Sequence, residues 1–74
     1  MQSNRNPLVD PQPGDVIVLR QGWTRTVTRR VDDWILFESV FDNRHHKGIG
    51  CYLAFWRRAC ELPTAYVIRR GEDA

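Results

Sequence analysis

The chain has 74 residues, and its eleven Lys and Arg against nine Asp and Glu leave a formal net charge of only +2. A chain of this length buries only about 60% of the surface that its unfolded state exposes, which allows one small core. Length therefore excludes two-domain enzymes, dinucleotide-binding folds and triosephosphate-isomerase-type barrels. The 42% hydrophobic content, which includes three Trp, two Tyr and three Phe, is that of a folded domain and not of a disordered chain.

Both ends of the chain differ in composition from its middle. Residues 1–13 hold several prolines and little apolar surface, which predicts a flexible leader from which only Leu8 and Val9 dock on the domain. A proline-glycine turn follows, so we expect a single domain over residues 14–70. Residues 71–74 are predicted to form a frayed acidic tail.

Features that would direct the chain to a membrane or out of the cell are missing from the sequence. No stretch approaches the roughly 18 apolar residues that span a bilayer, and the N-terminus lacks the apolar centre of a secretory signal. If one helix carries both Cys51 and Cys60, they lie about 13.5 Å apart along its axis, whereas bridged Cα atoms lie within about 7 Å. We therefore expect reduced thiols in a cytoplasmic protein with no membrane partner.

Two strands are predicted directly after the leader. Val16 to Leu19 is a short apolar run between turn residues, which is typical of a buried strand. Residues 23–31 then alternate with a period of two, which indicates a second strand. One face of that strand is predicted to carry Trp23, Arg25, Val27, Arg29 and Val31.

A third strand and a loop are predicted next. Asp32-Asp33 is a polar break of hairpin length. Residues 34–41 form the third strand, and because both of its faces carry large apolar groups we expect it to be covered on both sides. One face holds Ile35, Phe37, Ser39 and Phe41, and the other holds Trp34, Leu36, Glu38 and Val40. Residues 42–50 are mostly polar and are predicted to be a long loop.

The period changes after Gly50. Tyr52, Phe55, Trp56 and Ala59 recur at helical spacing, which predicts an amphipathic helix over 52–61. Residues 65–70 alternate again and are predicted to close the fold as a strand, with Tyr66 and Ile68 facing inward.

This order of elements predicts a mainly β fold, a bent antiparallel sheet with one short helix near the C-terminus. The run Pro13-Gly14-Asp15-Val16-Ile17-Val18-Leu19 and the two strands after it resemble the opening hairpins of small SH3-like barrels from bacterial chromosomes, plasmids and phages. The resemblance covers residues 13–41 and implies an SH3-like small β-barrel. Members of that family bind RNA, DNA, peptides or proteins, so the resemblance does not choose the partner.

Arginine and aromatic residues are interleaved along the chain, and only Lys47 among the basic residues is not Arg. Arg beside an exposed ring is typical of surfaces that bind single-stranded nucleic acid, where charge holds phosphate and the ring stacks on a base. We therefore predict a non-catalytic module that binds nucleic acid. The candidate residues are Trp23, Arg25, Arg29, Arg30, Trp34, Arg44, His45, His46 and Lys47. The structural alternative is that the tryptophans fill the core and arginine stems lie across them.

Two other functions stay open. A protein-interaction module or homodimer would use an exposed face that holds Trp34, Leu36 and Val40. A small thiol enzyme would use Cys51, whose pKa a position in the first helical turn would lower, together with His45 or His46. Backbone amides at the start of the same helix could also hold a phosphate, with residues 44–47 nearby.

A metal site or a cofactor is not expected. The two histidines are adjacent and the two cysteines are nine positions apart, whereas zinc ligands come in pairs two to five residues apart. No oxyanion hole or orienting third group can be identified either, so we expect no catalytic activity.

Overall fold

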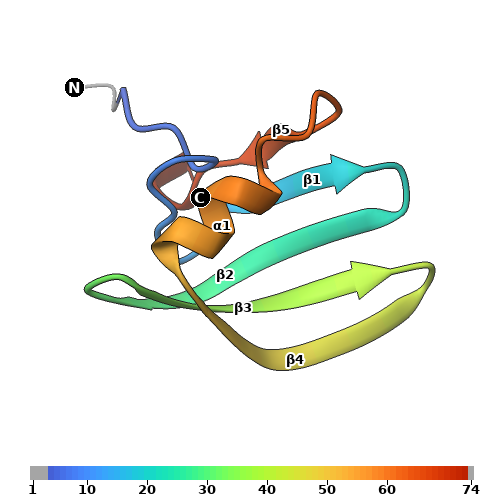
Figure 1. Cartoon of the computed structure of the whole chain (residues 1–74), viewed down its shortest axis with the longest axis horizontal. Helices are drawn as coiled ribbons and strands as arrows, with labels where there is room; N and C mark the ends of the chain where they lie inside the picture. The colour runs from blue at the N-terminus through green and yellow to red at the C-terminus, as the bar shows by residue number, and fades with distance from the viewer. Residues whose placement is uncertain (1–3, 74) are drawn as a thin grey trace.

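The computed structural model describes residues 4–73 and shows one antiparallel sheet with a short helix beside it (Figure 1). The strands are β1 (Val16–Arg20), β2 (Trp23–Val31), β3 (Trp34–Phe41), β4 (Arg44–Tyr52) and β5 (Tyr66–Arg69), in the order β4-β3-β2-β1-β5. The helix α1 (Leu53–Ala59) precedes β5, and a 3₁₀ turn, η1 (Gly71–Asp73), follows it. The predicted mainly β fold with one short helix is confirmed. In the described part of the chain, β4 and β5 are the edges of a sheet that is not closed.

The segment predicted as a loop, residues 42–50, is mostly strand β4, so that prediction is wrong. Asp42 and Asn43 both have positive φ, 54° and 65°, and form the two-residue turn that joins β3 to β4. This turn fits the right-handed twist of paired strands. The register then runs from Phe41↔Arg44 to Trp34↔Tyr52. Polar composition did not mark a loop because the first half of this edge strand is exposed.

A β-bulge interrupts the alternation of β2. Val27 pairs with Phe37, but Arg29 already pairs with Leu36, so the register shifts between Val27 and Arg29. The extra residue turns the following side chains to the opposite face of the sheet. The prediction that Arg25 and Arg29 share a face is therefore wrong.

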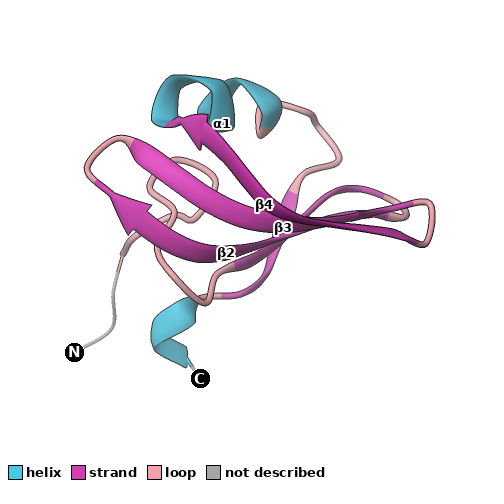
Figure 2. Cartoon of the chain, turned by 90° about the horizontal axis from the view of Figure 1, so that it is seen from below, coloured by secondary structure: helices cyan, strands magenta, loops and turns pink. Residues whose placement is uncertain are grey.

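The sheet buries only one of its faces, called here the inner face, against α1 (Figure 2). On β3, Ile35, Phe37 and Ser39 are buried on this side, whereas Trp34 on the other side is 37% exposed. The expected coverage of β3 on both sides is therefore wrong. The opposite, outer face is partly open to solvent.

Strand β5 has the opposite phase from the one predicted. Tyr66 and Ile68 are each 57% exposed, while Ala65 and Val67 pack against the core. An edge strand of four residues that carries apolar groups on both faces does not reveal from its sequence which face is buried.

The predicted helix is confirmed, although Tyr52 stays in extended conformation and only Leu53–Ala59 is helical. Trp56 is completely buried and meets the ring of Phe37 edge-on, with the centroids 5.3 Å apart. The core consists of Ile17, Leu19, Val27, Ile35, Phe37, Trp56 and Cys60. For Trp56, the interpretation as a core residue therefore holds.

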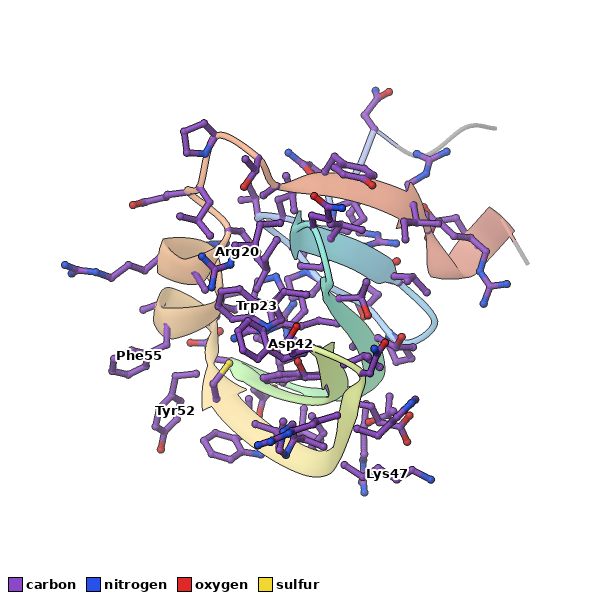
Figure 3. The ribbon with its side chains drawn as sticks, turned by 90° about the vertical axis from the view of Figure 1, so that its right-hand side faces the viewer. Arg20, Trp23, Asp42, Lys47, Tyr52 and Phe55 are labelled. Atoms are coloured by element: carbon purple, nitrogen blue, oxygen red, sulfur yellow. The ribbon has the colours of Figure 1, made fainter. Side chains whose placement is uncertain are left out.

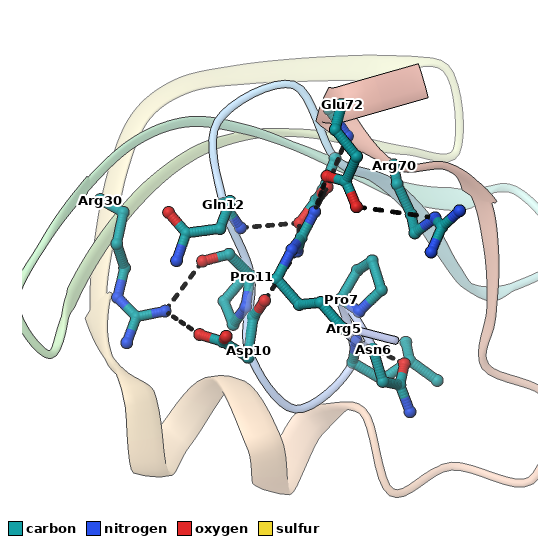
Figure 4. Close-up of polar contacts among 12 residues, drawn as sticks. Arg5, Asn6, Pro7, Asp10, Pro11, Gln12, Arg30, Arg70 and Glu72 are labelled. Atoms are coloured by element: carbon teal, nitrogen blue, oxygen red, sulfur yellow. Dashed lines mark hydrogen bonds and ion pairs between the residues drawn. The ribbon is translucent and has the colours of Figure 1, made fainter. Parts of the chain in front are cut away.

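The described part of the predicted leader, residues 4–13, is packed on the domain (Figure 4). Leu8 packs against the core as predicted, whereas Val9 is 48% exposed. The indole Nε1 of Trp56 donates to the carbonyl oxygen of Pro7 at 3.0 Å. Arg30 Nη1 bonds to Asp10 at 2.9 Å. Residues 1–3 of the leader and residue 74 of the predicted tail lie outside the described residues.

Candidate functional site

A pocket of about 370 Å³ opens on the inner face of the sheet, beside the core. We call it the Arg/aromatic pocket. It is lined by Arg20, Trp23, Arg25, Phe37, Ser39, Phe41, His46 and Ile49. Its volume lies at the small end of the range for ligand pockets, roughly 300–1,000 Å³.

Strand register brings these side chains together. Trp23 lies opposite Phe41, and Arg25 lies opposite Ser39, which in turn lies opposite His46. Directly opposed residues of antiparallel strands project to the same face. Because Ser39 is small and stands between Phe37 and Phe41 on β3, it leaves a depression between the two rings.

Arg25 forms the base of the pocket, and three aromatic rings surround its guanidinium group. The central carbon lies 4.5 Å from the ring centroid of Phe37, 5.4 Å from that of Trp23 and 5.5 Å from that of Trp56. Its Nε is buried without a hydrogen-bond partner. Burial lowers the pKa of Arg25, and the thiols of Cys51 and Cys60 oppose that shift.

Arg20 lies at the mouth of the pocket, where its side chain is exposed. Its guanidinium carbon is 5.7 Å from the ring centroid of Trp23 and 5.6 Å from that of Phe41, so one cation covers both rings. Figure 3 shows Arg20 next to Trp23. The two rings themselves meet edge-on with centroids 5.6 Å apart.

The charge of the pocket has one sign. Its lining includes two guanidinium groups and the imidazole of His46, and it contains no carboxylate. Aromatic rings and hydrogen-bond donors together suit an anion that carries a flat or apolar group.

The structure brings together only three of the nine predicted site residues, namely Trp23, Arg25 and His46. Arg30 bonds to the carbonyl oxygen of Pro11 and to Asp10 and thereby holds the leader. The remaining residues lie elsewhere: Arg29, Trp34 and His45 are on the outer face, and Arg44 and Lys47 are exposed on β4. Lys47 projects away from Trp23 in Figure 3.

Several lining residues were absent from the predicted set, namely Arg20, Phe37, Ser39, Phe41 and Ile49. The sequence did contain a signal for part of this group, because Phe37, Ser39 and Phe41 alternate on one face with a small residue between two rings. Arg20 and Ile49 become neighbours of that face only through strand pairing.

The outer face presents a second group of aromatic side chains. Trp34 and Tyr52 meet edge-on with ring centroids 4.9 Å apart, and Tyr52 is 59% exposed. Gly50 lies under this pair, and a Cβ atom at this position would overlap the indole of Trp34. Val31 lies opposite Trp34 and is also exposed.

The predicted thiol site is not built as expected. Cys51 lies on β4 opposite Ile35 and not in the first turn of a helix. Burial raises the pKa of Cys51, although the charge of Arg25 opposes this shift. Burial likewise raises the pKa of Cys60 to about 11. The expected position of Cys51 in the first helical turn is therefore wrong, and the raised pKa does not favour the thiolate.

The phosphate site considered at the start of the helix also differs from the structure. His45 and His46 are neighbours on one strand, so their side chains project to opposite faces. Residues 44–47 begin β4, whereas α1 follows its end, so these residues do not cluster at the start of the helix. Within residues 4–73, no three His, Cys, Asp or Glu side chains gather as a metal-binding group.

Comparison with known protein families, curated proteins and solved structures gives no significant match. The resemblance to SH3-like barrels therefore stays a prediction. Over the described residues, no helix has the length and apolar character needed to cross a membrane.

Proposed function

We propose that the chain is a non-catalytic module that binds single-stranded nucleic acid in the Arg/aromatic pocket. One observation carries this proposal: two exposed or half-buried rings, Trp23 and Phe41, adjoin two guanidinium groups in a pocket that no carboxylate lines. Rings and cations in one groove are the combination that single-stranded nucleic acid requires.

The two kinds of group would have separate tasks. A base would stack on Trp23 or Phe41, and stacking on an aromatic side chain contributes about 1–3 kcal/mol per base. Arg20 and Arg25 would donate to a phosphate, and such charge-assisted bonds are about twice as strong as neutral ones. An unpaired base is required because a base within a duplex offers no free face.

An amide chemical-shift titration with a short oligothymidylate tests the proposal. We expect shift changes that saturate and that concentrate on residues 20–25, 37–41 and 46–49. Raising the salt concentration should weaken the complex because counterions compete for the phosphates. A duplex of the same length should bind more weakly than the single strand.

Two matched variants locate the contact on one face of the sheet. Arg25→Met removes one of the two guanidinium groups of the pocket, whereas Arg29→Met removes one from the same strand on the outer face. We expect the first to lower affinity about tenfold or more, and the second to change it only slightly. Equal losses in the two variants, or no shift changes at low salt, would contradict the proposal.

The SH3-like barrel also stays a proposal. The succession of hairpins β1-β2-β3-β4, followed by a short helix and a strand that pairs with β1, supports it. In the described part of the chain β4 and β5 are open edges, so a closed barrel would require these two strands to pair with each other. Amide protection of both edge strands against solvent exchange would support closure, and rapid exchange along both edges would contradict it.

A second candidate function, homodimerisation, is favoured by the outer face. Val31, Trp34 and Tyr52 are exposed to 45%, 37% and 59%, and aromatic side chains are enriched at protein interfaces. Sedimentation velocity over a range of protein concentrations tests it. Association that Trp34→Ala abolishes would support a dimer, and a monomer throughout the range would contradict it.

A further inference from the structure

We propose that the Arg/aromatic pocket takes one unpaired nucleotide, whose base displaces the side chain of Arg20 from the rings of Trp23 and Phe41. This inference rests on the proposed function and specifies its unit of recognition. The displaced Arg20 then donates to the phosphate of the same nucleotide. In this view Arg20 occupies the stacking site while no ligand is bound.

Arg20 covers the rings on which a base would stack. Its guanidinium lies over both rings, at 5.7 Å from Trp23 and 5.6 Å from Phe41. A planar cation thus covers the surface on which a base would stack. Arg20 is exposed at the end of β1, so its side chain can leave the rings without disturbing the core.

Arg25, unlike Arg20, is held in place by its surroundings. Its guanidinium is enclosed by Trp23, Phe37 and Trp56 on the inner face, and its Nε is buried. Displacing Arg25 would open the core, whereas displacing Arg20 would not. The pocket therefore combines a fixed cation at its base with a movable one at its mouth.

The volume and shape of the pocket limit how many nucleotides it can hold. Its volume is about 370 Å³, close to the lower limit of roughly 300 Å³ for small-ligand pockets. Its rings, Trp23 and Phe41, meet edge-on and not in parallel, so they do not form a slot for two stacked bases. One base and its phosphate are the unit that this arrangement accommodates.

The first experiment compares parts of one nucleotide. Adenosine 5′-monophosphate, adenosine and ribose 5-phosphate are each titrated into the full chain while the indole N–H resonance of Trp23 is followed. We expect the monophosphate to bind with a dissociation constant on the order of 1 mM, and each of its parts to bind at least about tenfold more weakly. Phenylacetate is included as an aromatic carboxylate without a phosphate.

The second experiment uses Arg20→Ala, with Arg29→Ala as the matched control on the outer face. Removing Arg20 uncovers the rings but deletes a phosphate donor. Adenosine should therefore bind more tightly to Arg20→Ala than to the unaltered chain, while adenosine 5′-monophosphate should bind more weakly. Arg29→Ala should leave both affinities unchanged. A merely structural effect of Arg20 would change both ligands in the same direction.

The outcomes separate this inference from the proposed function. If oligothymidylate shifts the pocket residues but adenosine 5′-monophosphate does not, single-strand binding stands and the one-nucleotide site is wrong. If phenylacetate binds as tightly as the monophosphate, the pocket recognises aromatic carboxylates and the nucleotide assignment is wrong. If Arg20→Ala weakens adenosine binding, the displacement of Arg20 is wrong. If neither nucleic acid nor nucleotide binds, both proposals fail.

Discussion

Arg25 is a charged side chain that lies among aromatic rings on the inner face. Its Nε is buried without a hydrogen-bond partner, and leaving a buried donor unsatisfied costs roughly 1–3 kcal/mol. Contacts with the three rings around it offset that cost, since each cation–π contact contributes about 0.5–2 kcal/mol. The two effects are of similar size, so the charge of Arg25 adds little to the stability of the fold.

We therefore predict that Arg25→Met leaves the free energy of unfolding unchanged or raises it by up to about 2 kcal/mol. Met keeps a flexible stem among Trp23, Phe37 and Trp56 and removes the unpartnered donor. Urea unfolding followed by circular dichroism measures the change. A loss of more than about 2 kcal/mol would mean that the ring contacts of Arg25 carry the fold.

Gly50 packs closely against the side chain of Trp34 on the outer face. We predict that Gly50→Ala lowers the free energy of unfolding by about 1–3 kcal/mol, because the new Cβ overlaps the indole of Trp34. In a Trp34→Ala background the same substitution should be neutral or stabilising, since Ala costs less backbone entropy than Gly. A double-mutant cycle of urea unfolding measures this coupling. Equal effects in both backgrounds would contradict the steric explanation.

The raised pKa values of the two thiols predict that both react slowly with alkylating reagents. Because burial raises the pKa of Cys60 to about 11 and also raises that of Cys51, iodoacetamide should react with both more slowly than with glutathione at neutral pH. Arg25→Met removes the charge that opposes this shift, so reaction should slow further. Mass spectrometry of the alkylated chain measures both rates. Rapid alkylation of Cys51 would restore the idea of an activated nucleophile.

Among the helices and strands, the sequence predicted those whose residue pattern is contained within the element itself. Helix α1 and the strands β2 and β3 were identified because their residues repeat at 3.6 or two residues, and β1 because it is a short apolar run between turn residues. Strand β4 was missed because its polarity reflects an exposed edge, and its evidence lay in the paired turn residues Asp42 and Asn43.

The sequence predicted only part of the candidate site, because strand pairing decides which side chains share a face. Trp23 and Arg25 were found because they alternate on one strand. The bulge between Val27 and Arg29 then moved Arg29 to the other face. A bulge is set by the pairing with β3, so the residues of β2 alone do not reveal it. Phe41 joins the pocket through that pairing, and Ile49 joins it through the pairing of β4 with β3.

Helix α1 depends on the leader for its buried indole. Trp56 Nε1 donates to the carbonyl oxygen of Pro7, and Arg57 Nε donates to that of Val9 at 2.7 Å. We predict that Trp56→Phe lowers the free energy of unfolding by about 1–3 kcal/mol, because it removes a buried donor and leaves a cavity. Arg57→Ala, which removes an exposed donor, should cost less. Thermal unfolding of both variants tests this order, and a reversed order would contradict it.

For the whole molecule, Asp15 joins the two ends of the chain. Its side chain is completely buried and accepts hydrogen bonds from Arg5 at 2.5 and 2.8 Å. It also accepts from the backbone N–H groups of Gln12 and Gly71, both at 2.7 Å. Arg5 bonds in addition to Glu72, so the leader and η1 meet at one carboxylate directly before β1.

We predict that the Asp15 carboxylate makes the stability of the fold sensitive to acid. Burial raises the pKa of Asp15, but the hydrogen bonds from Arg5, Gln12 and Gly71 outweigh it and hold the pKa below its usual value. A pKa that is lower in the folded than in the unfolded state stabilises the fold above the unfolded value, about 3.9, and this stability is lost as the pH falls through the folded value. Urea unfolding should therefore show stability falling steeply below about pH 4.

Arg5→Met tests the assignment of that acid sensitivity to Asp15. Without the guanidinium, the pKa of Asp15 rises from its lowered value, so acid should remove less stability through this group. Asp10→Asn is the matched control, because Asp10 is a half-exposed carboxylate paired with Arg30. It should keep the pH profile of the unaltered chain. If Arg5→Met lost stability between neutral pH and pH 3 as steeply as the unaltered chain does, Asp15 would not be the group that acid titrates, and the connection between the two ends would rest on packing alone.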